Sequence, residues 1–237
     1  MKKRKVQEIE AWDGEEKKGK RMVKILETGI DYGTFGNIWA ASLCFSRYVS
    51  TSDGTRRLEG KRVLELGSGT GLGGLSSVIF GNADSVVLTD MPIAMDDLNN
   101  NVSINKTKAD DRRFSTMSLT MGNEDNESHE KIISLKPDII LCSDLMYNSK
   151  MIQLVCTTLR RVVKNSETSI WIVFTDRTVK GDPEPLEKLK AHGFQCTKKL
   201  DLMTLECCHS LCKIEEYDYL DDVQIWLWEL HLMKTIT

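Results

Sequence analysis

The stretch VLELGSGTGLGG, residues 63–74, decides the fold of this chain. It begins as an almost wholly apolar segment, as a parallel strand buried on both faces does. Alternating glycines follow, which let the backbone pass close to a ligand and leave N–H groups open at the start of a helix. A strand that leads through such a turn into a helix is typical of an open α/β sheet, where small molecules bind beyond the carboxyl ends of the strands.

Strand-like and helix-like segments alternate downstream of this stretch. Buried strands are predicted over residues 61–66, 85–90, 114–120, 138–144 and 169–176, with two more near 195–205 and 223–233. Helical patterns cover residues 36–49, 72–80, 92–105, 149–164 and 184–192. The alternation predicts a Rossmann-like α/β fold with a seven-stranded, mostly parallel sheet and helices on both faces. The polar, acidic residues 122–131 predict an exposed loop.

Length and composition fit one large domain. The chain has 237 residues, of which 41% are hydrophobic, and this is enough for one sizeable core. Residues 1–30 are charged and carry almost no periodic apolar signal, so we expect a charged N-terminal extension followed by a single domain over residues 31–237. The run Lys2–Lys5 has two interpretations, a solvated tail or a nuclear address.

The charge balance and the cysteine content argue against a nucleic-acid-binding, membrane-bound or disulfide-stabilised protein. The 35 acidic and 32 basic side chains are mixed and give a net charge of −3, so no single-sign field favours DNA or a membrane as partner. The sequence has no run of about eighteen apolar residues and no apolar centre of a signal peptide. Its seven cysteines are odd in number and irregularly spaced, unlike a disulfide framework. We expect a soluble, monomeric, cytoplasmic protein, with the nucleus as a second compartment.

One cluster, Cys207, Cys208, His209 and Cys212, raises the alternative of a zinc site. Four ligands within six residues would form an awkward tetrahedral cage, and no second Cys/His pair lies elsewhere in the chain to complete a normal one. Ordinary reduced thiols near the sheet are therefore the prediction, with no metal.

The glycine turn also matches a dinucleotide pattern. Gly69, Gly71 and Gly74 spell G-x-G-x-x-G, and Asp90 follows at the distance that an NAD site requires. The predicted strand ends before Gly67, however, so the tight turn begins two residues too early for that register. Glu65 beside the turn would repel a pyrophosphate but would attract the cationic methionine head of S-adenosylmethionine. The sequence G-K-[S/T] of NTP-binding loops is absent.

Asp90 ends the second strand, at the position where a carboxylate binds the vicinal hydroxyls of a ribose. The alternative is that Asp90 is the N-cap of the helix that begins after Met91.

Three segments resemble a known family. VLELGSGTGLGG, LTDMP (residues 88–92) and CSDLMYN (residues 142–148) are similar to the seven-stranded protein lysine methyltransferases of family 16. Trp39 in NIWAA resembles the family's N-terminal tryptophan, and Asn101 and Asn105 resemble its second-helix asparagines. The resemblance, from about residue 30 onward, implies a class I methyltransferase fold, S-adenosylmethionine as methyl donor, and a lysine of a protein, for example a chaperone or translation factor, as acceptor.

The most specific element of the resemblance is Asp144-Leu145-Met146-Tyr147. Methyltransferases that act on nucleobase amino groups carry Asn/Asp-Pro-Pro-aromatic here to hold a planar base, and this chain has no such prolines. An acid and an aromatic suit a long cationic side chain, because Asp144 can bind the ε-amine and Tyr147 can stack against it. The alternative makes Asp144 a helix N-cap and Tyr147 a core residue.

The chain departs from the family at Met121, which stands where the family usually has a tryptophan near the adenine. The resulting prediction names Asp144 and Tyr147 as catalytic residues. The predicted donor-binding residues are Trp39, Glu65, Gly67, Ser68, Gly69, Gly71, Asp90, Met91, Met121 and Ser143.

Two other functions stay open at this point. A methyltransferase acting on a small molecule or nucleic acid would be favoured if the basic segment Lys17–Lys24 lined the cleft. A binding module without catalysis would keep the fold and the ligand, but the intact set of Glu65, Gly67, Gly69 and Asp90 argues against it.

Overall fold

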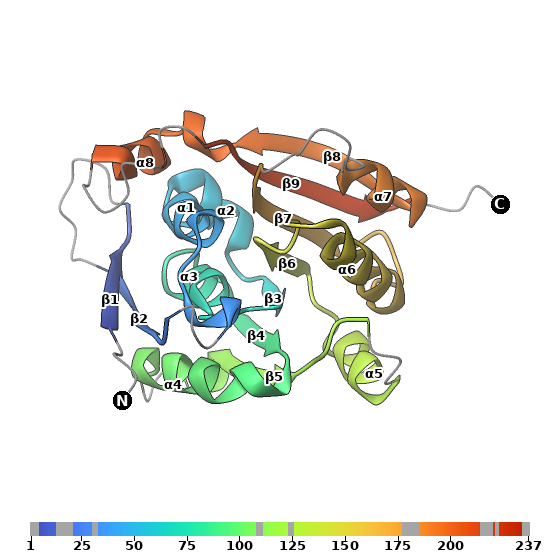
Figure 1. Cartoon of the computed structure of the whole chain (residues 1–237), viewed down its shortest axis with the longest axis horizontal. Helices are drawn as coiled ribbons and strands as arrows, with labels where there is room; N and C mark the ends of the chain where they lie inside the picture. The colour runs from blue at the N-terminus through green and yellow to red at the C-terminus, as the bar shows by residue number, and fades with distance from the viewer. Residues whose placement is uncertain are drawn as a thin grey trace.

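The computed structural model describes residues 5–12, 21–29, 33–107, 111–122, 126–176, 185–213, 220 and 223–233. Its centre is a seven-stranded sheet in the order β5-β4-β3-β6-β7-β9-β8 (Figure 1). The first five strands in that order are parallel, and β9 runs antiparallel to both β7 and β8. The strands are β3 (Arg62–Leu66), β4 (Ser85–Asp90), β5 (Phe114–Ser118), β6 (Ile139–Ser143), β7 (Ser169–Thr175), β8 (Phe194–Asp201) and β9 (Ile225–Leu232). The predicted sheet is thereby confirmed.

Helices cover both faces of the sheet, and each face has its own apolar cluster (Figure 1). One face carries α1 (Ala40–Val49), α2 (Ser52–Leu58), α3 (Leu72–Ile79) and α4 (Met95–Asn105). The other face carries α5 (Asn126–Leu135), α6 (Ser149–Val162) and α7 (Pro185–Ala191). The short helix α8 (Glu206–His209) packs beside α1, and no helix in the described ranges is long and apolar enough to cross a membrane. Single 3-10 turns lie at Thr34–Gly36, Pro92–Ala94, Asp111–Arg113, Leu202–Thr204 and Ser210–Lys213.

The N-terminal segment differs from the sequence prediction. Strands β1 (Lys5–Glu10) and β2 (Met22–Glu27) form an antiparallel pair, which the treatment of residues 1–30 as a charged extension did not predict. Val23 and Ile25 are fully buried and belong to the same apolar cluster as the sheet. In β2 these two apolar side chains point inward, but the charged residue between them masks this alternation in the sequence. Residues 2–4 of the basic run lie outside the described part of the chain.

The acidic segment at residues 122–131 is also a correction. Residues 123–125 lie outside the described part of the chain, but residue 126 already begins α5, so the loop prediction is wrong from there onward. The polar half of this helix is stabilised by an ion pair between Lys131 and Glu127 at 2.7 Å, one turn apart. Its apolar half reaches the core through Ile132, which is fully buried. The predicted loop ended at residue 131, before Ile132, so it contained only polar residues of the helix and none of its apolar ones.

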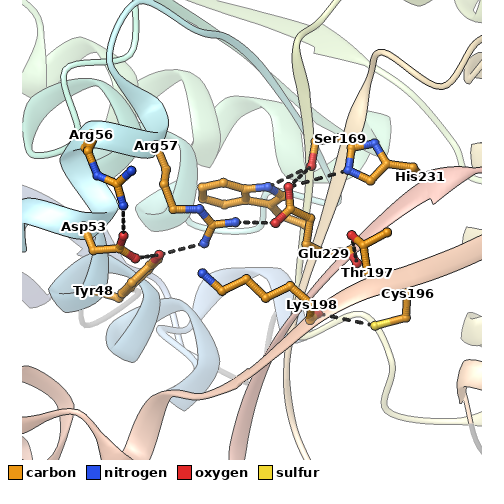
Figure 2. Close-up of polar contacts among 11 residues, drawn as sticks. Tyr48, Asp53, Arg56, Arg57, Ser169, Cys196, Thr197, Lys198, Glu229 and His231 are labelled. Atoms are coloured by element: carbon orange, nitrogen blue, oxygen red, sulfur yellow. Dashed lines mark hydrogen bonds and ion pairs between the residues drawn. The ribbon is translucent and has the colours of Figure 1, made fainter.

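A partly buried network of charged side chains joins α1 and α2 to the strands β7 and β9 (Figure 2). The guanidinium of Arg57 pairs with Glu229 at 2.5 Å, donates to the hydroxyl of Tyr48 at 2.7 Å, and lies 4.4 Å from the ring centroid of Trp171. Burial raises the pKa of Tyr48 to about 12, so its hydroxyl keeps its proton and donates to Asp53 at 2.8 Å. The network thus connects α1 and α2 with β7 and β9.

Replacing Arg57 tests how much this network stabilises the fold. Arg57→Ala removes the ion pair with Glu229, whose side chain is 22% exposed and keeps its hydrogen bond from Ser169, and it removes the cation–π contact with Trp171. We expect a loss of about 2–4 kcal/mol in the free energy of unfolding, since breaking one half of a mostly buried pair is costly. The free energy of unfolding is measured by urea denaturation, with tryptophan fluorescence as the probe.

Arg56 supplies the matched control. It is the neighbouring arginine, its side chain is 76% exposed, and it pairs with Asp53 on the surface. Arg56→Ala should change the free energy of unfolding by less than about 1 kcal/mol. Equal effects of the two substitutions would show that the Arg57 network contributes no more than a surface ion pair.

Candidate functional site

A cavity of about 450 Å³ opens at the carboxyl ends of β3, β4 and β6. The sheet order places β4 on one side of β3 and β6 on the other, so the connections diverge at this point. Divergence of this kind is where open α/β sheets bind their ligands, and the volume lies in the usual range for small-molecule sites. Of the predicted site residues, all but Gly71 line the cavity: Trp39, Glu65, Gly67, Ser68, Gly69, Asp90, Met91, Met121, Ser143, Asp144 and Tyr147.

Gly67 and Gly71 in the turn after β3 occupy positions where a side chain would collide with its neighbours. Gly67 has a φ of +61°, and a Cβ at this position would lie 2.8 Å from a methyl group of Leu145 and 3.2 Å from Cε of Met121. Gly71, with a φ of +84°, is the N-cap of α3, where a Cβ would lie 2.9 Å from Leu98. Gly67 therefore shapes the cavity, whereas Gly71 sets the packing of the helix behind it.

Glu65 is a buried acid at the base of the cavity. It is 1% exposed, and its Oε2 accepts a hydrogen bond of 3.0 Å from the backbone N–H of Gly74 at the start of α3. The absence of side chains at Gly73 and Gly74 leaves the room that this carboxyl group occupies. Burial raises the pKa of Glu65 to about 8. A cation brought next to it would favour the ionised form and lower that pKa.

Asp90 is oriented by the turn rather than by the helix that follows. Its two oxygens accept hydrogen bonds of 2.7 Å each from the backbone N–H groups of Gly69 and Met91. The 3-10 turn Pro92–Ala94 has Met91 as its N-cap and no side-chain cap, so Asp90 is not a helix cap. Burial raises the pKa of Asp90. The carboxylate is thus held at the wall of the cavity beside the glycine turn.

Ser68 lines the cavity, but its hydroxyl is engaged in the turn. Its Oγ accepts a hydrogen bond from the backbone N–H of Thr89 at 3.1 Å and donates to the carbonyl of Glu65 at 3.4 Å. Ser68 therefore joins the ends of β3 and β4.

Asp144 occupies a strained backbone conformation directly after β6. Its φ is +53°, a region that residues other than glycine rarely adopt and that is concentrated at functional sites. Its backbone N–H donates to the carbonyl of Val173 at 2.7 Å, and its Oδ1 accepts from the N–H of Thr175 at 3.3 Å. Asp144 is 8% exposed. The last residues of β7 therefore fix both its backbone and its carboxylate.

Asp144 is not the N-cap of α6, and Tyr147 is not a core residue, so the alternative that gave them these two roles is wrong. The N-cap of α6 is Asn148, whose side chain accepts a hydrogen bond from the N–H of Met151 at 2.8 Å. Tyr147 lines the cavity and is 39% exposed, unlike a core residue. Burial, then the carboxylates of Asp144 and Asp90, raise the pKa of Tyr147, so its phenol stays neutral.

One wall of the cavity consists of residues that the sequence pattern did not predict. The segment from Gly33 to Trp39 contributes Phe35 and Asn37, and Ile93 and Met151 line the cavity elsewhere. Trp39 itself is held in this wall, because its Nε1 donates to the carbonyl of Thr34 at 2.9 Å. For Phe35 and Asn37, their closeness to Trp39 in the sequence was the one feature that would have indicated them, and Ile93 and Met151 had no such feature.

The chemistry of the lining suits a cationic ligand with polar groups. Its ionisable acids are Glu65, Asp90 and Asp144, and no Lys, Arg or His is among the described residues that line it. The Nδ2 of Asn37 and the Oγ of Ser143 are buried in the lining without a hydrogen-bond partner in the described chain. Buried polar atoms of this kind are normally satisfied, here by a ligand. These groups fit the amino acid, sulfonium and ribose of S-adenosylmethionine.

Cys207, Cys208 and Cys212 do not line the cavity. Cys207 and Cys208 are buried in the core beside α1, with 3.8 Å between their sulfur atoms, and Cys208 contacts the carbonyl of Cys44 at 3.3 Å. Within the described ranges, no three His, Cys, Asp or Glu side chains are grouped as metal ligands. These positions are compatible with ordinary core packing.

Comparisons with known proteins agree with this geometry. A family model described as Lysine methyltransferase matches residues 17–192. Protein N-lysine methyltransferase METTL21A of Xenopus tropicalis is 28% identical over 170 residues, which is 72% of this chain and 74% of that protein. EEF1A lysine methyltransferase 3 of Mus musculus is 27% identical over 134 residues, or 56% of this chain. The match spans about half of that relative's length, 53%.

Solved structures support the fold. The P. horikoshii TYW2 structure in complex with MeSAdo superposes with a TM-score of 0.55 at 15% identity and covers 92% of this chain and 70% of that one. An O-methyltransferase family protein from Burkholderia thailandensis gives a TM-score of 0.51 at 11% identity, over 79% of this chain and 55% of that one. Both likenesses concern the arrangement of the sheet and helices.

The family match covers most of the chain and contains the glycine turn, Asp90 and the Asp144–Tyr147 motif. S-adenosylmethionine is the methyl donor of this class of enzyme, and the lining of the cavity fits it. The family resemblance seen in the sequence is thereby confirmed: the chain belongs to the lysine methyltransferase family.

Proposed function

We propose that this chain is an S-adenosylmethionine-dependent methyltransferase that modifies the ε-amine of a lysine on a protein. One observation carries the proposal: the cavity has carboxylates at both ends, and no basic side chain lines it in the described chain. Such a lining attracts cations and repels phosphates. The names of the relatives give lysine as the acceptor of those proteins, and this supports the same acceptor here.

The donor end comprises the glycine turn and the two acids beside it. When bound there, S-adenosylmethionine supplies an electrophilic methyl group on a sulfonium. Glu65 provides negative charge at the base of the site, and Asp90 presents a carboxylate that accepts hydrogen bonds from hydroxyl groups. Met121, which lies beside Gly67, is placed to cover an aromatic ring. These residues bind and orient the donor and take no part in proton transfer.

The acceptor end is built around Asp144 and Tyr147. A lysine has a pKa of about 10.4 in water and must lose a proton before its nitrogen can attack. Desolvation in the cavity lowers that pKa, and water carries the proton away. Asp144, fixed by its hydrogen bond with Thr175, orients the amine, and Tyr147 stacks against the cationic side chain. Most of the acceleration then comes from holding the nitrogen, methyl and sulfur in line.

A nucleic-acid acceptor is less well supported. Leu145 and Met146 replace the prolines of a base clamp, and both are buried in the apolar cluster of the α6 face. The basic segment that would favour a nucleic acid is described only from residue 21 onward. Within that part, Lys24 lies on β2 at 3.4 Å from Glu8 and does not line the cavity. The residues Lys17–Lys20 lie outside the described chain.

The partner, oligomeric state and compartment are further parts of the proposal. The protein substrate is a chaperone or a translation factor, and the name EEF1A lysine methyltransferase 3 of one relative supports the second class. A monomer is supported by edge strand β8, where Lys198 and Lys199 and a bulge after Cys196 discourage edge-to-edge pairing. Seven cysteines support a reducing compartment, the cytoplasm with the nucleus as a second location.

Substituting Glu65 separates its role in binding from its effect on stability. With a pKa of about 8 in the folded protein against an ordinary value of 4.5, Glu65 takes up a proton on folding between these pH values. Its contribution to stability is present below pH 4.5 and is lost as the pH rises through 8. Glu65→Gln should therefore raise the melting temperature at pH 8 more than at pH 5, and should weaken donor binding by about tenfold or more because the negative charge is gone.

Thermal melts and calorimetry with S-adenosylmethionine measure both effects. The control is Glu59→Gln, an exposed acid at the end of α2, which should alter neither quantity. Donor affinity that is unchanged in Glu65→Gln would contradict the role assigned to this charge. Tight NADH binding by the wild-type protein would contradict the ligand itself.

Substituting Asp144 tests its assignment to the acceptor. Asn tolerates the left-handed backbone at this position and keeps an oxygen that accepts from Thr175, so Asp144→Asn removes the charge with little rearrangement. We expect lysine methylation to fall by about 100-fold, in the range of a lost positioning or acid–base group, while donor affinity stays within a few-fold. Asp144→Ala should abolish methylation. The assay is labelled methyl transfer into a lysate that lacks the enzyme. A collapse of donor affinity with an unchanged rate per bound complex would assign Asp144 to the donor instead.

Met121 tests the adenine end of the cavity. Indole offers more flat area than a thioether, and aromatic pairing adds roughly 0.5–1.5 kcal/mol beyond area burial. Met121→Trp should therefore tighten donor binding by about two- to tenfold, and Met121→Ala should weaken it, without changing which lysine is modified. Donor affinity and melting temperature are measured on both variants. A lower melting temperature without a gain in affinity for Met121→Trp would mean that Met121 fills the core.

A further inference from the structure

The missed wall of the cavity is held from outside by the N-terminal hairpin β1–β2. The backbone N–H of Ile38 donates to Oε1 of Glu27 at 2.8 Å, and the N–H of Thr28 donates to the carbonyl of Gly36 at 3.0 Å. Ile38 stands between Asn37 and Trp39, which both line the cavity. The end of β2 is therefore attached to the wall at two points.

Glu27 is itself fixed in position. Its second oxygen, Oε2, accepts a hydrogen bond from the side-chain amide of Gln7 on β1 at 3.2 Å. The side chain is half-buried, so water competes less with its bond to the N–H of Ile38. A carboxylate that accepts from a backbone N–H makes a stronger bond than a neutral acceptor does.

The hairpin is anchored independently of Glu27. Asn101, which is fully buried on α4, accepts from the N–H of Leu26 at 2.7 Å and donates to the carbonyl of Thr70 in the glycine turn at 3.0 Å. One turn later, Asn105 accepts from the N–H of Lys24 at 2.8 Å and donates to its carbonyl at 2.6 Å. The two amides occupy the outer edge of β2 as a neighbouring strand would. Loss of the Glu27 carboxylate therefore leaves the hairpin in place and removes the attachment next to Asn37 and Trp39, while the bond between Thr28 and Gly36 stays.

We propose that Glu27 is a positioning residue for the methyl donor: through Ile38 it holds Asn37 and Trp39 against the donor end of the cavity. Glu27 does not line the cavity and touches no reacting atom. Its effect is on how tightly the donor is held, not on the chemical step at Asp144. This inference rests on the proposed function, because it requires that the cavity bind S-adenosylmethionine.

The test compares Glu27→Ala with the conservative Glu27→Gln in the full chain. Calorimetry with S-adenosylhomocysteine gives the dissociation constant, and steady-state methylation gives KM for the donor and kcat at saturating donor. Glu27→Ala should raise the dissociation constant and KM by roughly five- to twentyfold, the equivalent of losing one charge-assisted hydrogen bond, while kcat stays within about twofold. Glu27→Gln should restore most of the affinity, because its amide oxygen still accepts from Ile38.

A control on the same hairpin is Glu8→Ala. Glu8 forms a surface ion pair with Lys24, and its side chain is 52% exposed, so its loss should leave donor affinity and kcat unchanged. Donor affinity in Glu27→Ala equal to that of the wild type would overturn the inference while leaving the proposed function intact. Equal losses of affinity, kcat and melting temperature in both Glu27 variants would assign a purely structural role and would also overturn it. Failure of the wild-type protein to bind the donor would overturn the proposed function together with the inference.

Discussion

The close approach of β3 and β6 at their carboxyl ends is the constraint on which the rest of the site depends. Gly67 faces Leu145 across this junction, and a side chain at Gly67 would lie 2.8 Å from it. The backbone must therefore turn immediately after β3, in a left-handed conformation that suits glycine. That turn leaves the space of the cavity in front and directs the N–H groups of α3 toward Glu65 behind. Asp144, at the end of β6, meets the same junction from the other side and adopts a φ of +53°.

Buried carboxylates give this junction its chemical character. Glu65 accepts a hydrogen bond from a backbone N–H of α3, Asp90 accepts one from the glycine turn, and Asp144 accepts one from the end of β7. Burial raises the pKa of Glu65 and of Asp90, so the protein holds these acids at a cost in stability that a cationic ligand offsets. Buried acids of this kind favour a ligand that carries a positive charge, such as a sulfonium. Membership of the lysine methyltransferase family accords with that chemistry.

Two sets of contacts outside the junction hold the surrounding elements together, one next to the cavity and one between α2 and β9. Near the junction, the wall formed by residues 33–39 closes the donor end and is tied to the hairpin through Glu27. Farther away, Arg57 and Glu229, which are 172 positions apart in the chain, join α2 to the C-terminal strand β9. Asn101 links the hairpin to the glycine turn, since its amide contacts both β2 and the carbonyl of Thr70. The described hairpin β1–β2 thus packs against the wall of the cavity and against α4.

The sequence by itself determined the seven strands of the sheet, five of the helices, the glycine turn and the acids at the strand ends, because two- and 3.6-residue periodicities and glycine's conformational freedom are local properties. The resemblance to the lysine methyltransferases followed from the same short segments. Only the tertiary structure decided that β1 and β2 form a packed hairpin, that residues 126–131 are helical, and that Phe35 and Asn37 line the cavity. It also decided the partners of each buried carboxylate, such as Thr175 for Asp144. These contacts join residues far apart in the chain, and their stability comes from burial in the folded protein, which no local pattern records.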